Sequence, residues 1–113
     1  MEKKFEVVRL ADAALEFEGE TGSTLDKKID DTNSDEMGGG YFSVHNSPNR
    51  MDLPYDEIAI CLKGVFKLTV DGVVSELHPG DFAFIPKGTD VIFDGENAVC
   101  AYGVHPVDWR SKM

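Results

Sequence analysis

No apolar run in the sequence is long enough to cross a membrane, since the longest, such as Ile58–Leu62, have the length of a β-strand. No apolar segment follows the lysines of the first five residues, so we expect no secretory signal. Cysteine is scarce, and Cys61 and Cys100 lie in apolar stretches where a thiol usually packs as a small hydrophobic group. We therefore predict reduced cysteines and a cytoplasmic protein.

Basic residues are also few: the chain has 11 lysine and arginine residues against 21 aspartate and glutamate residues, a net charge of −10. Nucleic acid and anionic membrane surfaces both require a basic protein surface, so this balance argues against both as partners. The length of 113 residues suits one domain, and we predict a single one over 1–113. Its N-terminal part, 1–36, is expected to hold short strands and an acidic loop.

Short alternating segments separated by turn residues run through the chain, and none has a convincing helical period. The N-terminal part predicts half-buried strands at Phe5–Leu10 and Leu15–Glu18, then a loop with an edge strand near Leu25–Ile29. Asp71-Gly72 predicts a tight hairpin, and Asp94–Asn97 predicts a turn. The remaining expected strands are Tyr41–His45, Ile58–Leu62, Val65–Val70, Val73–Leu77, Phe82–Ile85, Val91–Phe93 and Ala98–Val104. This pattern predicts an all-β sandwich or barrel.

Two spaced motifs in the centre of the chain are the most informative. Glu57 precedes Gly64 with six residues between them, and Gly80 begins a G-x5-P-x-G pattern that ends at Gly88. With the Asp-Gly hairpin between them, these motifs resemble those of the cupin superfamily, and the resemblance runs over about 40–104. It implies a single cupin-type jelly-roll β-barrel, which is the fold that we predict.

The histidines that metal-binding cupins carry in these motifs are missing. Their positions hold Met51, Leu53 and Val91, or Arg50 and Asp52 in place of the first two under the alternative spacing. A single carboxylate, Glu57, does not bind zinc or iron usefully without imidazole neighbours. We therefore expect no tightly bound transition metal and no cofactor. A metal site with unusual ligands, such as His45 and Glu57, is an alternative.

A narrower resemblance is to the EutQ-like cupins of ethanolamine utilisation. It rests on four segments, Met37–Gly40, Tyr55–Ile58, Phe84–Gly88 and Pro106–Trp109. The resemblance implies a bacterial cytoplasmic protein associated with a metabolic microcompartment, a homodimer, and acetate kinase activity as a candidate. The residues around Lys87 lack the glycine spacing and the helix of a P-loop, so they do not predict a phosphate cradle.

Glu57 is the candidate catalytic residue. Alternation along its strand places Glu57, Ala59 and Cys61 on one face, which the cupin register turns into the barrel. Burial of the carboxyl group should raise its pKa, so that it could act as a general acid or base near neutral pH. A structural role, in which neighbouring tyrosines satisfy a buried glutamate, is an equal alternative.

The candidate ligand-binding residues are those expected beside Glu57 on the lining strands: Tyr41, Ser43, Met51, Tyr55, Val91 and Tyr102. The predicted function is binding of a small carboxylate or acyl phosphate in the barrel, with Glu57 as the central polar group. Whether the protein catalyses a reaction stays open. One alternative is a non-catalytic binding or accessory protein, and a second is a metal-dependent cupin with noncanonical ligands.

Overall fold

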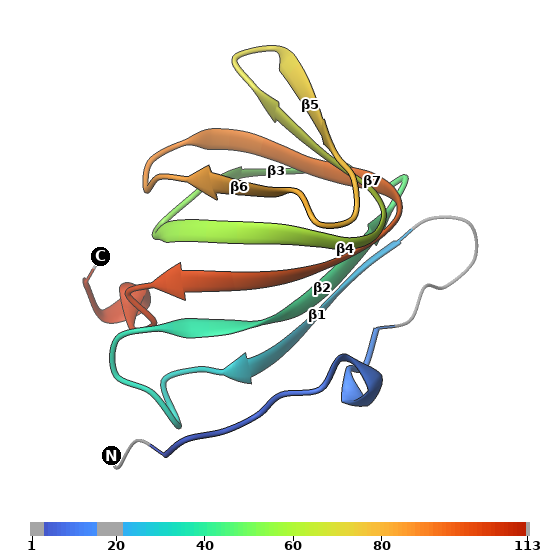
Figure 1. Cartoon of the computed structure of the whole chain (residues 1–113). Coiled ribbons are helices and arrows are strands. Elements are labelled where there is room, and N and C mark those ends of the chain that lie inside the picture. The colour runs from blue at the N-terminus through green and yellow to red at the C-terminus, as the bar shows by residue number, and fades with distance from the viewer. Residues whose placement is uncertain (1–3, 16–21, 113) are drawn as a thin grey trace.

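The computed structural model describes residues 4–15 and 22–112 (Figure 1). Strands dominate this part of the chain, and none of its helices has the length and apolar character that a membrane span needs. Its elements are the 3-10 turns η1 (Leu10–Asp12) and η2 (Trp109–Lys112) and the strands β1 (Gly22–Ile29), β2 (Gly38–His45), β3 (Asn49–Asp52), β4 (Asp56–Val70), β5 (Val73–Leu77), β6 (Phe82–Ile85) and β7 (Asp90–His105).

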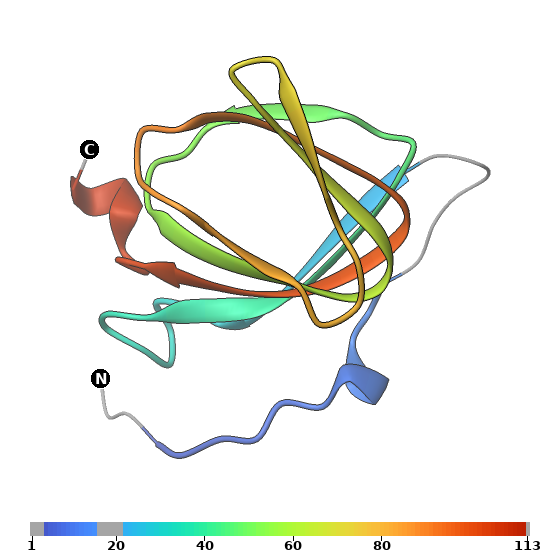
Figure 2. The ribbon, with the colours of Figure 1, turned by 45° about the horizontal axis from the view of Figure 1, so that its top comes forward.

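The two longest strands, β4 and β7, form the centre of the fold. They pair antiparallel from Asp56 opposite His105 to Val70 opposite Val91. On the outer edge of β4, β6 pairs with the first half and β5 with the second. On the outer edge of β7, β3 and β2 take the two halves in the same way, and β1 extends the sheet beyond β2. The strands curve around a common core (Figure 2), and the predicted all-β class is confirmed.

A bend halfway along β4 and β7 allows their two halves to face each other. The pairing register shifts between Cys61 and Lys63 and again between Lys63 and Val65. Gly64 has a φ of 71° and Asn97 on the opposite strand has a φ of 49°. A Cβ atom on Gly64 would collide with the backbone carbonyl oxygens of Glu96 and Asn97, so only glycine fits here.

The core lies between the two halves. The ring of Phe42 on β2 meets the ring of Phe66 edge-on with centroids 5.3 Å apart, and Phe66 stacks on Phe93 at 5.9 Å. Cys61 and Cys100 lie opposite each other in the β4–β7 register as fully buried free thiols. The core therefore joins residues from both halves of the bent strands.

Several expected strands are confirmed, some with different bounds. The hairpin at Asp71-Gly72 joins β4 and β5, and both turn residues have positive φ, 52° and 76°. The edge strand expected near Leu25–Ile29 is β1, which begins earlier, at Gly22. Ile58–Leu62 and Val65–Val70 are parts of one strand, β4, because the bulge bends the strand without ending it.

Two secondary-structure predictions are wrong, and a third is wrong at the one residue of it that the structure describes. Phe5–Leu10 is no strand: it is extended outside the sheet and leads into η1, with Phe5 92% exposed. An alternating sequence forms a strand only where a sheet edge is available for pairing, and this segment does not pair with one. Leu15 lies outside any strand as well, and the rest of that predicted strand, 16–18, lies outside the described residues. Asp94–Asn97 is no turn, because it continues β7 opposite Val65–Lys67.

We predict that Gly64→Ala destabilises the protein far more than Gly72→Ala. Both glycines have positive φ, but a Cβ at Gly64 collides with backbone, whereas one at Gly72 meets open space. Gly72→Ala should cost about 1 kcal/mol of unfolding free energy, and Gly64→Ala about 3 kcal/mol or more. Urea unfolding followed by circular dichroism measures both. Equal losses for the two variants would contradict the role assigned to the bend.

Candidate functional site

Glu57 lies near the start of β4, between Ile85 of β6 and Val104 of β7 in the pairing register. Glu57 is 5% exposed, whereas the next residue, Ile58, is 43% exposed. Ala59 follows on the same face as Glu57 and is fully buried. The carboxyl group therefore points into the core side of the sheet, as alternation along the strand predicts.

The Glu57 carboxyl group has no hydrogen bond or ion pair within the described part of the chain. Burial raises its pKa from the ordinary value of 4.5 to about 7, because an apolar environment disfavours the charged form. Near neutral pH the group is thus divided between a protonated form, which donates a hydrogen bond, and an ionised form, which only accepts. Such a group can exchange a proton with a bound molecule.

Two tyrosines surround this carboxyl group. Burial, and then the charge of Glu57, raise the pKa of Tyr55 to about 12. The pKa of Tyr102 is also raised to about 12, by burial first and then by the nearby charges of Tyr55 and Glu57. Both phenols therefore keep their protons. Burial likewise raises the pKa of the Cys100 thiol, which also interacts with Glu57. The structure brings Glu57, Tyr55 and Tyr102 together; their roles stay predictions.

Aromatic contacts hold the two tyrosine rings. Tyr55 meets Trp109 of η2 edge-on with centroids 5.7 Å apart, and Tyr102 lies 5.9 Å from Phe42. Sequence reasoning missed the part played by Trp109. The sequence shows Trp109 as an aromatic residue after the last strand, but no local pattern reveals that it contacts Tyr55.

Met51 and Val91 pair across β3 and β7; Val91 belongs to the apolar core, and Met51, which is partly buried, packs against it. Val91 is fully buried and Leu53 is 1% exposed. These are the positions where metal-binding cupins have histidine, and aliphatic side chains and one thioether do not fit zinc or iron. In the described ranges, 4–15 and 22–112, no three histidine, cysteine, aspartate or glutamate side chains gather into a metal site.

His45 does not join Glu57. Its ring accepts a hydrogen bond from the backbone N–H of Asn97 at 2.9 Å, close to the bend. Gly38, at the other end of β2, is the residue level with Val104 and hence with Glu57. Seven residues of strand separate His45 from that level, a distance of roughly 20 Å. The two side chains are too far apart to share a metal ion.

Tyr41 and Ser43 do not line the interior with Glu57, which corrects the sequence prediction. Phe42 between them points into the core, so Tyr41 and Ser43 lie on the other face of β2. There the Tyr41 hydroxyl donates a hydrogen bond to the backbone carbonyl of Val8 at 3.3 Å, and Ser43 bonds to Thr24. Their polar groups fasten the N-terminal segment and β1.

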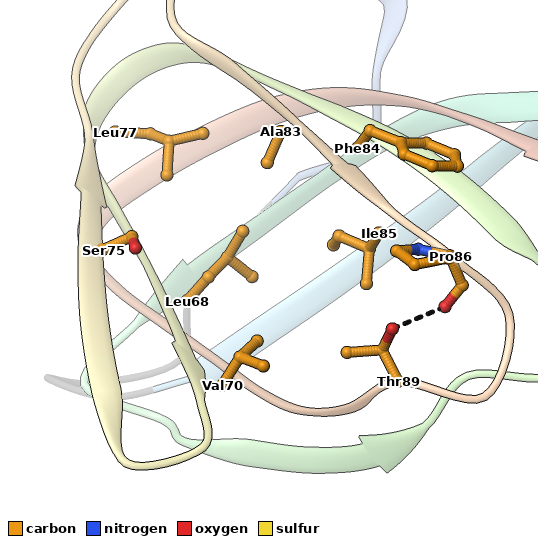
Figure 3. A pocket seen from close by; sticks show the side chains of 9 residues that line it. All are labelled: Leu68, Val70, Ser75, Leu77, Ala83, Phe84, Ile85, Pro86 and Thr89. Carbon is orange, nitrogen blue, oxygen red and sulfur yellow. Dashed lines mark hydrogen bonds between the residues drawn. The ribbon is translucent and has the colours of Figure 1, made fainter.

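Two depressions open on the surface, and Glu57 lines neither. One, of about 350 Å³, lies between β5 and β6 (Figure 3). The other, of about 310 Å³, lies beside η2 and is lined by Asp52, Leu53, Pro54, Lys87, Gly88, Pro106 and Trp109. Sequence reasoning found neither depression, because each depends on segments that meet only in the folded chain.

The antiparallel strands around an apolar core, built on a bent pair of long strands, give this chain a cupin fold. A cupin-2 domain protein from Shewanella frigidimarina superposes with a TM-score of 0.58 at 14% identity, over 72% of this chain and 79% of that one. A family model described as ethanolamine utilisation protein EutQ matches residues 9–111. The chain belongs to the EutQ family.

Relatives from one organism agree with this assignment. The EutQ protein structure from Clostridium difficile superposes with a TM-score of 0.74 at 26% identity, over 82% of this chain and 69% of that one. The acetate kinase EutQ of Clostridioides difficile is 30% identical over 80 residues, which are 70% of this chain and 51% of that protein. The chain thus spans about half the length of that curated relative.

We predict that Glu57→Gln removes a pH dependence of stability. The pKa of Glu57 is about 7 in the folded protein, above its ordinary value of 4.5, so its stabilising contribution is complete below pH 4.5 and is lost as the pH rises to 7. Relative to Glu57→Gln, the wild type should lose about 3 kcal/mol of unfolding free energy over this range. Tyr55, Tyr102 and Cys100 keep their protons throughout and do not contribute.

Urea unfolding at a series of pH values measures this difference. Glu76→Gln, which neutralises an exposed carboxylate on β5, is the matched control and should keep the wild-type dependence. A difference between wild type and Glu57→Gln that does not change with pH would show that Glu57 titrates at its ordinary value.

Proposed function

We propose that this protein binds a small carboxylic acid or acyl phosphate in the interior of its barrel, with Glu57 as the group that receives it. One observation carries the proposal: Glu57 as a residue is only 5% exposed, and its carboxyl group has no hydrogen-bond or ion-pair partner in the described residues. A buried polar group without a partner costs free energy. A ligand that bonds to this carboxyl group offsets that cost.

The protonated form of Glu57 suits such a ligand. A neutral carboxyl group donates a hydrogen bond to a carboxylate or acyl oxygen, whereas an ionised one repels an anion. The pKa of about 7 keeps the protonated form populated at neutral pH. The hydroxyl groups of Tyr55 and Tyr102 remain protonated and provide two further donors. Together they form a receptor for an oxygen-rich head group in an otherwise apolar interior.

The observation that favours a second candidate function is the name of the curated relative, acetate kinase EutQ, at 30% identity. Acetate and acetyl phosphate belong to the ligand classes proposed for Glu57. However, phosphoryl transfer requires cationic groups around the phosphate. No cation stands among the described residues that neighbour Glu57 in the strand register or in charge interactions. Ile85 and Val104 are aliphatic, and Tyr55, Cys100 and Tyr102 keep their protons and are neutral. We therefore propose binding as the primary function of this chain.

We predict that the affinity for butanoate falls about tenfold between pH 6 and pH 8, because only protonated Glu57 accepts the anion and its pKa is about 7. Isothermal titration calorimetry measures the dissociation constants. Glu57→Gln keeps an uncharged donor at all pH values, so its affinity should not change with pH. Glu76→Gln should behave as wild type. An undiminished pH dependence in Glu57→Gln would exclude Glu57 as the receiving group.

We also predict that the chain alone forms no acetyl phosphate from ATP, magnesium and acetate above the uncatalysed background, because none of the described neighbours of Glu57 is a cation for the phosphate. Trapping of acetyl phosphate with hydroxylamine measures the product. Turnover by the wild type that Glu57→Gln abolishes and Glu76→Gln retains would favour the kinase function over simple binding.

A further inference from the structure

The depression between β5 and β6 arises from the strand pairing. Both strands pair with β4, β6 with its first half and β5 with its second, and they have no pairing with each other. The sheet is therefore open between them. The volume of this opening, about 350 Å³, lies within the range of small-molecule sites. We name it the β5–β6 pocket; its lining residues are Leu68, Val70, Ser75, Leu77, Ala83, Phe84, Ile85, Pro86 and Thr89.

The lining of the β5–β6 pocket is mostly apolar. Leu68, Leu77 and Ile85 belong to the buried core and form its inner wall. The Thr89 hydroxyl is already used, because it donates to the carbonyl of Pro86 at 2.7 Å (Figure 3). Among the described residues that line the pocket, Ser75 is thus the one whose side-chain hydroxyl makes no hydrogen bond to another described residue. The pocket suits a hydrocarbon group with at most one polar contact.

The inner wall of the pocket adjoins Glu57. Ile85, which lines the pocket, is the direct cross-strand partner of Glu57. Both side chains are nearly buried, at 4% and 5% exposed, and cross-strand neighbours have Cβ atoms about 5 Å apart. A molecule in the pocket therefore lies one side chain away from the unpartnered carboxyl group.

The β5 hairpin leaves apolar surface open beside the pocket. Val73 pairs with Val70, a lining residue, and therefore faces the same side of the sheet, yet it is 66% exposed. A bound hydrocarbon group would cover this side chain and remove apolar surface from water.

The size of the pocket argues against acetate as its natural occupant. A volume of about 350 Å³ holds on the order of ten heavy atoms, if each takes about 30 Å³, as water does. Acetate has four heavy atoms and would leave most of the lining without contacts.

We propose that the β5–β6 pocket binds the hydrocarbon group of an acid whose carboxyl group meets Glu57, so that the ligand is an alkanoic or arylalkanoic acid of about six to ten carbons. The contact between the ligand's carboxyl group and Glu57 rests on the proposed function, whereas the contact of its hydrocarbon group rests on the pocket alone. The Ile85 side chain lies between Glu57 and the pocket, so binding of such an acid requires this side chain to shift.

Calorimetric titration of the full chain at pH 6 with acetate, butanoate, hexanoate and octanoate tests the proposal. The dissociation constant should fall about threefold to fourfold for each added methylene group, because each is transferred from water to an apolar lining. Equal affinities along the series, or affinities that fall with length, would overturn it.

Ser75→Phe fills the pocket from its rim and should abolish the dependence on chain length. Val74→Phe is the matched control, because it adds the same ring to the next residue, on the opposite face of β5, and should leave the series unchanged. Thermal unfolding confirms that each variant is folded, and Ser75→Leu provides a smaller substitution should Ser75→Phe fail to fold. If the dissociation constants depend on the chain length of the acid in the same way in both phenylalanine variants, the proposal is overturned.

Titration with 1-hexanol separates this inference from the proposed function. Hexanol binding that Ser75→Phe removes supports the pocket, even where acid binding proves independent of Glu57 and the proposed function fails. Acids that bind through Glu57 with no effect of chain length, together with no binding of hexanol, overturn the pocket and leave the proposed function intact.

Discussion

The close approach of β4 and β7 at Gly64 is the constraint on which the rest of the structure depends. No side chain fits between the two backbones there, so the paired strands bend together rather than continue as one flat ribbon. Each half then presents its own edge to shorter strands. The bend also lets Phe42 on one half reach Phe66 and Phe93 on the other, and this contact closes the core. A straight β4–β7 pair would leave these rings on a single open face.

The same closure creates the cost at Glu57. A carboxyl group that would be harmless at the surface is held in an apolar interior, where its ionisation is opposed by desolvation. Stabilities of small domains are about 5–15 kcal/mol, so a penalty of about 3 kcal/mol at neutral pH is a considerable fraction. Glutamine or an aliphatic residue would avoid it. Perturbed carboxyl groups of this kind gather at binding and catalytic sites, which is why we assign the cost to function.

Local patterns predicted the features that depend on neighbours along the chain. Spacing around Glu57 and Gly88, and alternation along β4, were enough for the fold class and for the inward carboxyl group. The predictions were wrong where the pairing with a distant strand decides which way a side chain faces or whether a segment is a turn. Tyr41 and Phe42 are both aromatic, so β2 alone cannot show which of them faces inward; the register with β7 does. Asn97 has the positive φ of a turn residue, yet it occupies a bulge inside a strand. Composition does not distinguish these two settings.

In the two proposals, different parts of the molecule recognise the two parts of the ligand: Glu57 recognises the head group, and the β5–β6 pocket recognises the hydrocarbon group. Glu57 lies on β4, and in the proposed function it selects for an acidic or acyl head group whatever the remainder of the molecule. In the further proposal the hydrocarbon group meets Ser75 on β5, which lies outside both motifs, and Ala83 on β6, at a variable position of the second motif. A chain of this fold can therefore keep the same buried carboxyl group and admit acids of different length, through substitutions on β5 and β6 alone. The two proposals together imply that a relative named for acetate and this chain share the head-group site and differ in the acid they bind.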